Sequence, residues 1–304
     1  MTAVLPSQPR SQQVAGLLTA HLVVALVALV VIGGATRVME AGLACPDWPL
    51  CYGSLLPGRQ MNLQVFLEWF HRLDAFLVGL ALMALAALSI TARSSLPPWL
   101  PWGSALALAL VALQGALGAL TVTHLLAAPT VTAHLGTALV LVLVVSALHQ
   151  GLGRADPIAD RRPPIWWLVL LLMGTASLLI QCVLGGSMAS RWAADLCLSD
   201  GRGCRWLLAH RLGAWPVLLS LPVLTGLSWI LPAVGRPLRD LLLGATALVV
   251  LQVALGVATL RLQLQVPAIT VAHQLLAALL VALLGGVLGR SVLAIPRSSI
   301  PATR

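Results

Sequence analysis

Two stretches of the chain, FLEWFHRLDAF at residues 66–76 and LLAHRLGAW at residues 207–215, place the same His-Arg-Leu triplet near the start of a long apolar segment. The triplet is unusual in this chain because only 9% of the 304 residues are charged, whereas 59% are hydrophobic. A soluble domain carries about 25% charged residues, so this chain has too few polar groups to cover a surface that is exposed to water. We therefore expect an all-α integral membrane protein.

Apolar segments long enough to cross a bilayer recur along the chain. Each is close to the roughly 20 residues that a bilayer core requires. Only helices satisfy the backbone polar groups of such segments in lipid. The eight expected transmembrane spans are residues 14–37, 68–91, 102–123, 130–150, 165–188, 207–231, 238–260 and 270–292.

The net charge of +9 comes from 18 arginines and no lysine. These arginines are scattered over short loops and form no patch, which argues against nucleic acid as a partner. If the spans alternate across the membrane, the side of the termini carries slightly more arginines than the other side. This bias favours a protein of the cell (plasma) membrane with both termini in the cytoplasm.

Four cysteines form two pairs in loops on the predicted outer side. The oxidising compartment favours the disulfides Cys45–Cys51 and Cys197–Cys204. Free thiols or a four-cysteine metal site are the alternatives, although zinc usually requires closer cysteine spacing. Cys182 lies inside the fifth span, where we expect a small buried hydrophobic residue.

The chain contains an internal duplication. His71 and His210 are 139 residues apart, and so are His134 and His273. The third and seventh spans also share similar phrases, QGALGALTV from Gln114 and QVALGVATL from Gln252. Because each copy holds an even number of spans, both copies have the same orientation in the membrane.

We therefore expect two duplicated four-helix bundles, residues 1–150 and residues 151–304. A pseudo-two-fold axis along the membrane normal should relate them.

Each copy carries one histidine at the outer end of its second span and another at the outer end of its fourth. A lone membrane histidine usually hydrogen-bonds another helix, but two imidazoles from two helices can hold the iron of a flat macrocycle. The repetition favours His71 with His134, and His210 with His273, as metal ligands. Zinc and copper are less favoured, since no third ligand recurs near both pairs.

Three other histidines have no counterpart in the repeat. We expect packing or hydrogen bonding for His21 and His149, and the role of His124, near the outer end of the third span, is left open.

The two copies differ at one carboxylate. Glu68 precedes His71 by one helical turn, whereas Leu207 stands at the equivalent position before His210. A carboxylate beside a heme could act as acid, base or charge stabiliser, and complementing the helix dipole is the alternative. Arg72 and Arg211 could pair with heme propionates or extend to the outer interface.

Several phrases in both halves resemble the heme A synthase family of bacteria. They are GGATRVMEAGLACPDWPLCYGSLLP (33–57), EWFHRLDA (68–75), QGALGALTV (114–122), TAHLGTAL (132–139), AHRLGA (209–214) and VAHQLLAALL (271–280).

The resemblance implies oxidation of the C8 methyl group of heme O to a formyl group, which gives heme A for cytochrome oxidase assembly. It implies that His71 and His134 flank the heme O substrate, with Glu68 as the reactive-site carboxylate. It also implies that His210 and His273 ligate heme b as the cofactor.

Two other functions are compatible with the pattern. A diheme b-type electron-transfer cytochrome explains the four histidines but not the one-sided Glu68. A transporter would also fit a duplicated bundle, although its charges usually lie at mid-membrane. The expected partners are membrane lipid, an electron acceptor that the sequence does not identify, and heme O synthase; a homo-oligomer is also compatible.

Overall fold

The computed structural model describes residues 9–153 and 163–293. Eight helices in these ranges are long and apolar enough to cross a membrane, which confirms the expected number of spans. They are α1 (Arg10–Val38), α2 (Leu63–Thr91), α3 (Leu100–Thr123), α4 (Ala128–Gly151), α5 (Ile165–Ala189), α7 (Cys204–Ile230), α8 (Arg236–Arg261) and α9 (Pro267–Val292). A short helix, α6 (Ala193–Asp200), and a 3-10 turn, η1 (Gly58–Gln60), lie in the loops.

Some helices begin earlier than the apolar segments suggest. Helix α2 begins at Leu63 rather than at residue 68, because the side chain of Asn62 caps it by accepting a hydrogen bond from the Val65 N–H at 3.0 Å. More than one helical turn therefore precedes Glu68, so Glu68 lies inside α2 and not at its first residue.

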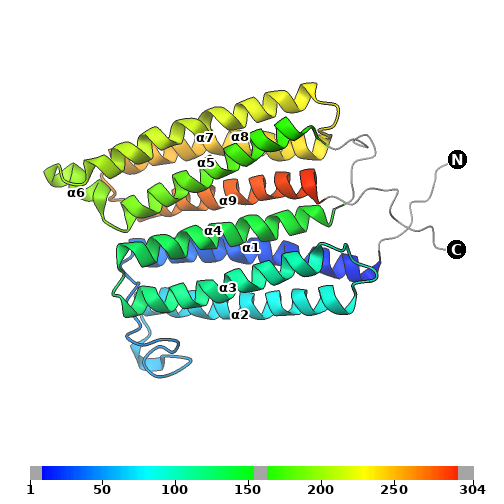
Figure 1. Cartoon of the computed structure of the whole chain (residues 1–304). Coiled ribbons are helices and arrows are strands. Elements are labelled where there is room, and N and C mark those ends of the chain that lie inside the picture. Colours follow the sequence, from blue (N-terminus) through cyan, green and yellow to red (C-terminus); the bar gives the residue numbers. More distant parts are fainter. Residues whose placement is uncertain (1–8, 154–162, 294–304) are drawn as a thin grey trace, which may run out of the picture.

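The helices form two groups of four (Figure 1): α1 to α4 in one, and α5, α7, α8 and α9 in the other. Helix α4 packs along α9 at the seam between the groups, while α1 contacts α9 and α5 contacts α4. A two-fold axis that exchanges α1 with α5 and α4 with α9 would produce these contacts. The axis itself and the domain boundary at residue 150 remain predictions. The first residue of α1 and the last of α9 lie at the same end of the molecule.

Glycines bring the two helices of the seam close together. A methyl group added at Gly285 of α9 would lie 2.5 Å from the carbonyl oxygen of Leu143 in α4. One turn further along α9, Gly289 faces the main chain of Ala147. Small residues at such positions allow transmembrane helices to approach until their main chains touch.

Two of the histidines that have no counterpart in the repeat make hydrogen bonds, as expected from the sequence. His21 donates from Nδ1 to the Leu17 carbonyl at 2.8 Å. His149, at the inner end of α4, lies 3.2 Å from the Thr19 hydroxyl through Nδ1 and so joins α4 to α1. His124 ends α3 with its Nδ1 3.2 Å from the Leu120 carbonyl.

The seam generates a stability prediction. Gly285→Val should destabilise the protein by about 1–3 kcal/mol, because the added side chain must push α9 away from α4. The matched control is Gly226→Val, since nothing lies within 4 Å of a methyl group at Gly226. Thermal unfolding of the purified protein in detergent measures both variants, and equal melting temperatures would contradict the tight seam.

Candidate functional site

The structure brings the four repeated histidines together in two pairs. His71 of α2 and His134 of α4 have ring centroids 6.4 Å apart with an interplanar angle of 78°. His210 of α7 and His273 of α9 have centroids 6.5 Å apart at 76°. Each group of four helices thus places imidazoles from its second and fourth long helices face to edge, and the two arrangements are nearly identical.

This spacing fits one metal ion between the two rings of each pair. A metal–imidazole bond is about 2 Å long and the nitrogen lies about 1 Å from its ring centre, so two rings that share a metal have centres about 6 Å apart. Within residues 9–153 and 163–293, no group of three or more His, Cys, Asp or Glu side chains could hold a metal ion. A macrocycle that supplies its own nitrogen ligands fits such two-histidine sites.

A glycine on a neighbouring helix makes room for each imidazole. A methyl group added at these glycines would meet the Cε1 atom of the facing ring at 2.9–3.5 Å, which is tighter than ordinary contact at three of the four positions. The four pairs are Gly33 with His71 (3.1 Å), Gly118 with His134 (3.5 Å), Gly185 with His210 (2.9 Å) and Gly256 with His273 (3.1 Å). The sequence analysis did not assign these glycines a role, although each lies in a repeated motif.

Two buried ring nitrogens in the first pair have no hydrogen-bond partner. The Nδ1 atoms of His71 and His134 are both buried, and no described residue bonds either atom. An orphaned buried polar atom costs free energy, and such atoms mark places where a ligand binds or a group moves. Together with the glycines, this observation is compatible with a ligand at the first pair, and the iron porphyrin at both pairs stays a prediction.

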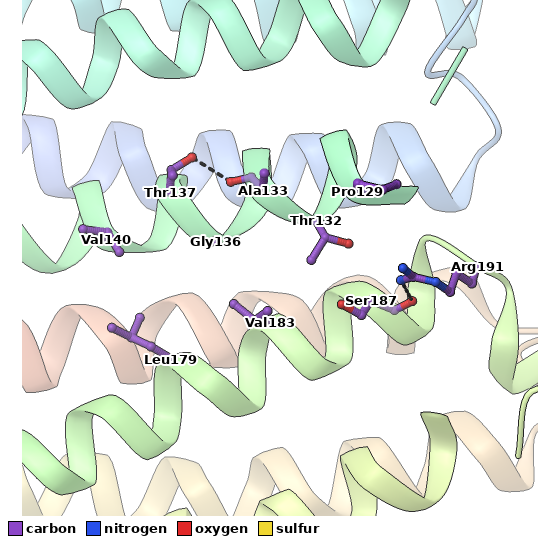
Figure 2. Close-up of a pocket in the computed structure, with 10 residues that line it drawn as sticks. All are labelled: Pro129, Thr132, Ala133, Gly136, Thr137, Val140, Leu179, Val183, Ser187 and Arg191. Carbon is purple, nitrogen blue, oxygen red and sulfur yellow. Dashed lines mark hydrogen bonds between the residues drawn. The ribbon is translucent and has the colours of Figure 1, made fainter. Parts of the chain in front are cut away.

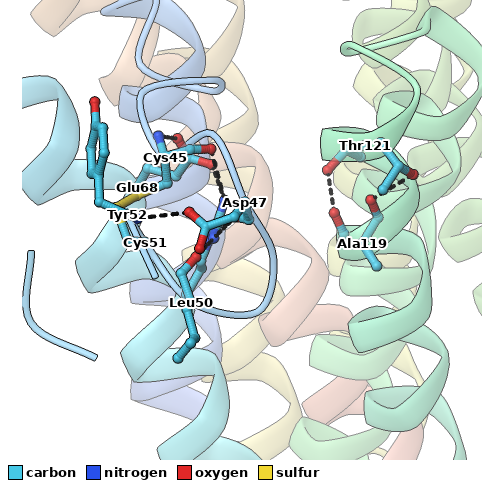
Figure 3. A network of polar contacts seen from close by, with 11 residues as sticks. Cys45, Asp47, Leu50, Cys51, Tyr52, Glu68, Ala119 and Thr121 are labelled. Atoms are coloured by element: carbon cyan, nitrogen blue, oxygen red, sulfur yellow. Dashed lines mark hydrogen bonds and ion pairs between the residues drawn. A yellow bond between two sulfur atoms is a disulfide. The ribbon is translucent and has the colours of Figure 1, made fainter. Parts of the chain in front are cut away.

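Glu68 and Arg72 connect α2 to the loop between α1 and α2, which we call the first outer loop after its predicted side of the membrane. Figure 3 shows Glu68 beside Cys45 of this loop. The Glu68 carboxylate is 4% exposed, and it accepts hydrogen bonds from the Cys45 N–H at 2.8 Å and from Arg72 at 2.5 Å. Arg72 also donates to the carbonyl groups of Asp47, at 2.6 Å, and of Leu50. Arg72 therefore holds the loop, and pairing with a heme propionate stays a prediction for it.

The same loop contains a carboxylate that the sequence analysis missed. Asp47 accepts hydrogen bonds from the Gly53 N–H at 2.8 Å and the Tyr52 N–H at 2.7 Å, and these bonds lower its pKa below the ordinary 3.8. Because the folded-state pKa is lowered, this contribution to loop stability is present above pH 3.8 and is lost as the pH falls through the lowered value. The signal in the sequence was its position between Cys45 and Cys51, inside the longest phrase that resembles the family, residues 33–57.

Both predicted disulfides are present. Cys45–Cys51 closes the first outer loop, and Cys197–Cys204 joins α6 to the first residue of α7. Arg211 is exposed and makes no hydrogen bond or ion pair with the described part of the chain, so its predicted role beside a propionate is untested.

An apolar groove of about 430 Å³ lies between α4 and α5 (Figure 2). Its end near the outer loops carries Arg191, which donates to the Ser187 carbonyl at 2.9 Å and lies over the Trp206 ring at 4.5 Å. The remaining lining residues are small, apolar or hydroxylated: Pro129, Thr132, Ala133, Gly136, Thr137, Val140, Leu179 and Val183. The groove follows the seam between the two helix groups, and neither histidine pair lines it.

Comparison with known proteins places both histidine pairs inside one matched region. Residues 16–284 match the COX15-CtaA family model, described as cytochrome oxidase assembly protein. A heme A synthase of Caulobacter vibrioides is 30% identical, with 93% of this chain and 96% of that protein covered. One of Shewanella oneidensis is 28% identical, with 83% and 89% covered. A protoheme IX farnesyltransferase of Halobacterium salinarum is 30% identical over 58% of this chain but only 45% of that protein.

The glycine contacts predict the effect of a single methyl group. In Gly185→Ala the new Cβ would lie 2.9 Å from Cε1 of His210, so the ring must move and the pair should lose its spacing. We expect the purified variant to retain less than half of the bound heme of the unmodified protein, measured by the pyridine hemochrome assay. Gly244→Ala is the control, since its Cβ would make only an ordinary 3.8 Å contact with Leu283; equal heme loss in both variants would show that the contact is unimportant.

The loop contacts predict the reactivity of one disulfide. Glu68→Ala removes the acceptor of the Cys45 N–H and the ionic partner of Arg72, so the first outer loop should open more often. We expect Cys45–Cys51 to be reduced by dithiothreitol about tenfold faster, since one or two buried charge-assisted hydrogen bonds are lost. Cys197–Cys204 is the control within the same molecule, and mass spectrometry of alkylated peptides measures both rates. An unchanged rate for Cys45–Cys51 would mean that Glu68 does not hold the loop.

Proposed function

The chain belongs to the COX15-CtaA family of cytochrome oxidase assembly proteins, and we propose from this premise that it is a multi-pass membrane oxidoreductase that makes heme A from heme O. The reaction would convert the C8 methyl group of heme O to a formyl group, which takes its oxygen atom from water and releases four protons together with four electrons that pass to an acceptor. The observation that carries the proposal is that the matched region, which relatives named heme A synthase share, contains two histidine pairs of the same geometry.

The two histidine pairs would bind different hemes. We propose that His71 and His134 hold the substrate heme O, and that His210 and His273 hold a resident heme b. When bound, heme b supplies an electron carrier next to the substrate half. The chain's own contribution is to hold the two imidazoles of each pair at a ring spacing that suits one iron between them.

Glu68 would act only at the proposed heme O site, beside His71. Arg72 and the Cys45 N–H hold its carboxylate in place through hydrogen bonds. Oxidation of a methyl group withdraws electrons and releases protons, and a carboxylate one turn from His71 can accept a proton or stabilise positive charge. Because Leu207 replaces Glu68 in the second half, that half lacks such a group.

The proposal also covers location and partners. We propose that the protein lies in the plasma membrane with cytoplasmic termini, and that it works beside a heme O synthase. This partner is supported by the similarity to a protein named protoheme IX farnesyltransferase, of whose length the match covers 45%. The electron acceptor is an additional partner that must receive the electrons withdrawn from the methyl group.

The test is expression of the protein in cells that supply heme O, followed by extraction and chromatography of the hemes. We expect heme A with the unmodified protein and none with His71→Ala. We expect Glu68→Gln to lower the rate of heme A formation by about a hundredfold, as loss of an acid–base group does, while the heme b content stays unchanged.

Asp74→Asn, which changes another carboxylate of α2, is the matched control and should leave the rate within about twofold. If heme b and heme O both bind but no heme A forms, the protein is instead a diheme electron-transfer cytochrome. The near-identical geometry of the two pairs favours that function as the alternative.

A further inference from the structure

The groove between α4 and α5 is open along its side. Val183 of α5, which lines the groove, is 39% exposed, and Ala133, on the α4 wall, is exposed as well. Both residues lie inside helices that are long and apolar enough to cross a membrane. A side chain that is exposed at such a depth faces lipid and not water. A lipid chain can therefore enter the groove sideways from the bilayer.

The length of the groove matches one leaflet of a bilayer. On α4 its lining residues extend from Pro129, in the first turn of the helix, to Val140. From residue 129 to residue 140, a rise of about 1.5 Å per residue gives a length of roughly 17 Å. The hydrocarbon core of a bilayer is about 30 Å thick. The groove therefore reaches from one membrane surface to about the middle of the bilayer, which is the depth of one acyl chain.

The polar groups of the groove gather at the end near the loops (Figure 2). Thr132, Ser187 and Arg191 lie at this end, whereas Val140 and Leu179 lie at the other. The groove is thus apolar where it is deep in the membrane and polar where it approaches the membrane surface.

Thr137, halfway along the groove, does not need a polar ligand. Its hydroxyl donates a hydrogen bond to the Ala133 carbonyl at 2.7 Å and accepts one from the side-chain amide of Gln114. Because the hydroxyl already has a donor and an acceptor within the protein, the middle of the groove can lie against an acyl chain without leaving a polar group unpaired.

Most hydrogen-bond donors of Arg191 have no partner in the described part of the chain. A guanidinium carries five N–H groups, and the one hydrogen bond that Arg191 makes to described residues goes to the Ser187 carbonyl at 2.9 Å. Arg191 also lies over the Trp206 ring at 4.5 Å, and it takes part in none of the ion pairs between described residues. A guanidinium binds a phosphate through two parallel hydrogen bonds, so this end of the groove suits a phosphate group.

The surroundings of Arg191 are positively charged. Arg37 lies 4.6 Å from the centre of the ring of Trp192, the residue that follows Arg191. The nearest carboxylates in the sequence, Glu40 and Asp195, are exposed, and neither forms an ion pair with these arginines in the described part of the chain. Tryptophans concentrate at the membrane interface, so this charge lies at the level of the lipid headgroups. An anionic headgroup therefore fits better than a zwitterionic one, whose own cation would add to the charge.

We propose that the groove binds one anionic phospholipid from the leaflet on the predicted outer side. One acyl chain lies between α4 and α5, and the phosphate accepts hydrogen bonds from Arg191. The apolar tail of heme O fits less well, because neither histidine pair lines the groove and because the tail offers no anion to Arg191. The inference does not depend on the proposed reaction.

The first test removes the guanidinium. The purified protein in detergent is incubated separately with dioleoyl phosphatidylglycerol and with dioleoyl phosphatidylcholine, and native mass spectrometry measures the lipid that each sample retains. We expect one phosphatidylglycerol per protein molecule and about fivefold weaker retention of phosphatidylcholine. Arg191→Gln should lower the affinity for phosphatidylglycerol about tenfold, since charge-assisted hydrogen bonds to the phosphate are lost. Arg191→Lys should keep part of this affinity, because it keeps the charge.

Arg261→Gln is the matched control for charge. It removes an exposed arginine at the end of α8, on the same predicted side of the membrane and outside the groove. Its retention of both lipids should equal that of the unmodified protein. An equal loss in Arg261→Gln and Arg191→Gln would show a general effect of net charge and would contradict the inference.

The second test fills the groove and leaves Arg191 in place. In Val183→Trp an indole ring takes the space of the acyl chain, and because residue 183 faces lipid the fold should tolerate it. We expect the affinity for phosphatidylglycerol to fall about tenfold. Val169→Trp is the control, since Val169 is 47% exposed on the same helix but does not line the groove. Melting temperatures without added lipid check that both variants fold.

Three further results would overturn the inference. Equal retention of phosphatidylcholine and phosphatidylglycerol by the unmodified protein would mean that the arginines do not select the headgroup. Unchanged retention in Val183→Trp would mean that the lipid binds elsewhere on the surface. Release of bound phosphatidylglycerol by equimolar heme O would assign the groove to the tail of that heme.

Discussion

Room for an imidazole between packed transmembrane helices is the constraint on which the site depends. Helices in a bundle pack with axes about 8–10 Å apart, so an inward-pointing histidine has most room where the neighbouring helix offers no Cβ. Each of the four histidines faces a glycine, and a methyl group at Gly185 would already lie 2.9 Å from the His210 ring. The spacing of 6.4 and 6.5 Å between the paired rings follows from this arrangement. Ionisable residues inside a membrane are costly and usually mark a functional site, which agrees with the proposed role of these two matching pairs as iron ligands.

Duplication supplied the same scaffold twice, and the surroundings of each pair then diverged. The first half has a carboxylate, Glu68, fixed by Arg72 beneath a disulfide-closed loop, and its histidines have no hydrogen-bond partners at Nδ1. The second half has no such carboxylate, but glutamines contact both imidazoles. The two histidine pairs therefore share their ring geometry but differ in the polar groups around them. Under the proposed function, this difference would separate a substrate site from a cofactor site.

Much of the fold could be predicted from the sequence, because composition and span length dictate helices in lipid and because the repeat of 139 residues pairs the histidines. Both disulfides followed from cysteines that share a loop. The partners of Glu68 and the two glutamine contacts could not be predicted, since they depend on how far each helix is rotated and tilted against its neighbour. Gln114 illustrates the limit: it matches Gln252 in sequence, yet a single hydroxyl at Thr137 redirects its amide.

The central claim is that each bundle holds a porphyrin iron between imidazoles of its second and fourth long helices. Near-infrared magnetic circular dichroism of the oxidised, purified protein tests it most directly, because the position of the charge-transfer band identifies both axial ligands of a low-spin heme. The account predicts a bis-imidazole band that disappears when His134→Ala and His273→Ala are combined and that weakens in His273→Ala alone. A folded protein without heme, or a band that is unchanged in that variant, would contradict it.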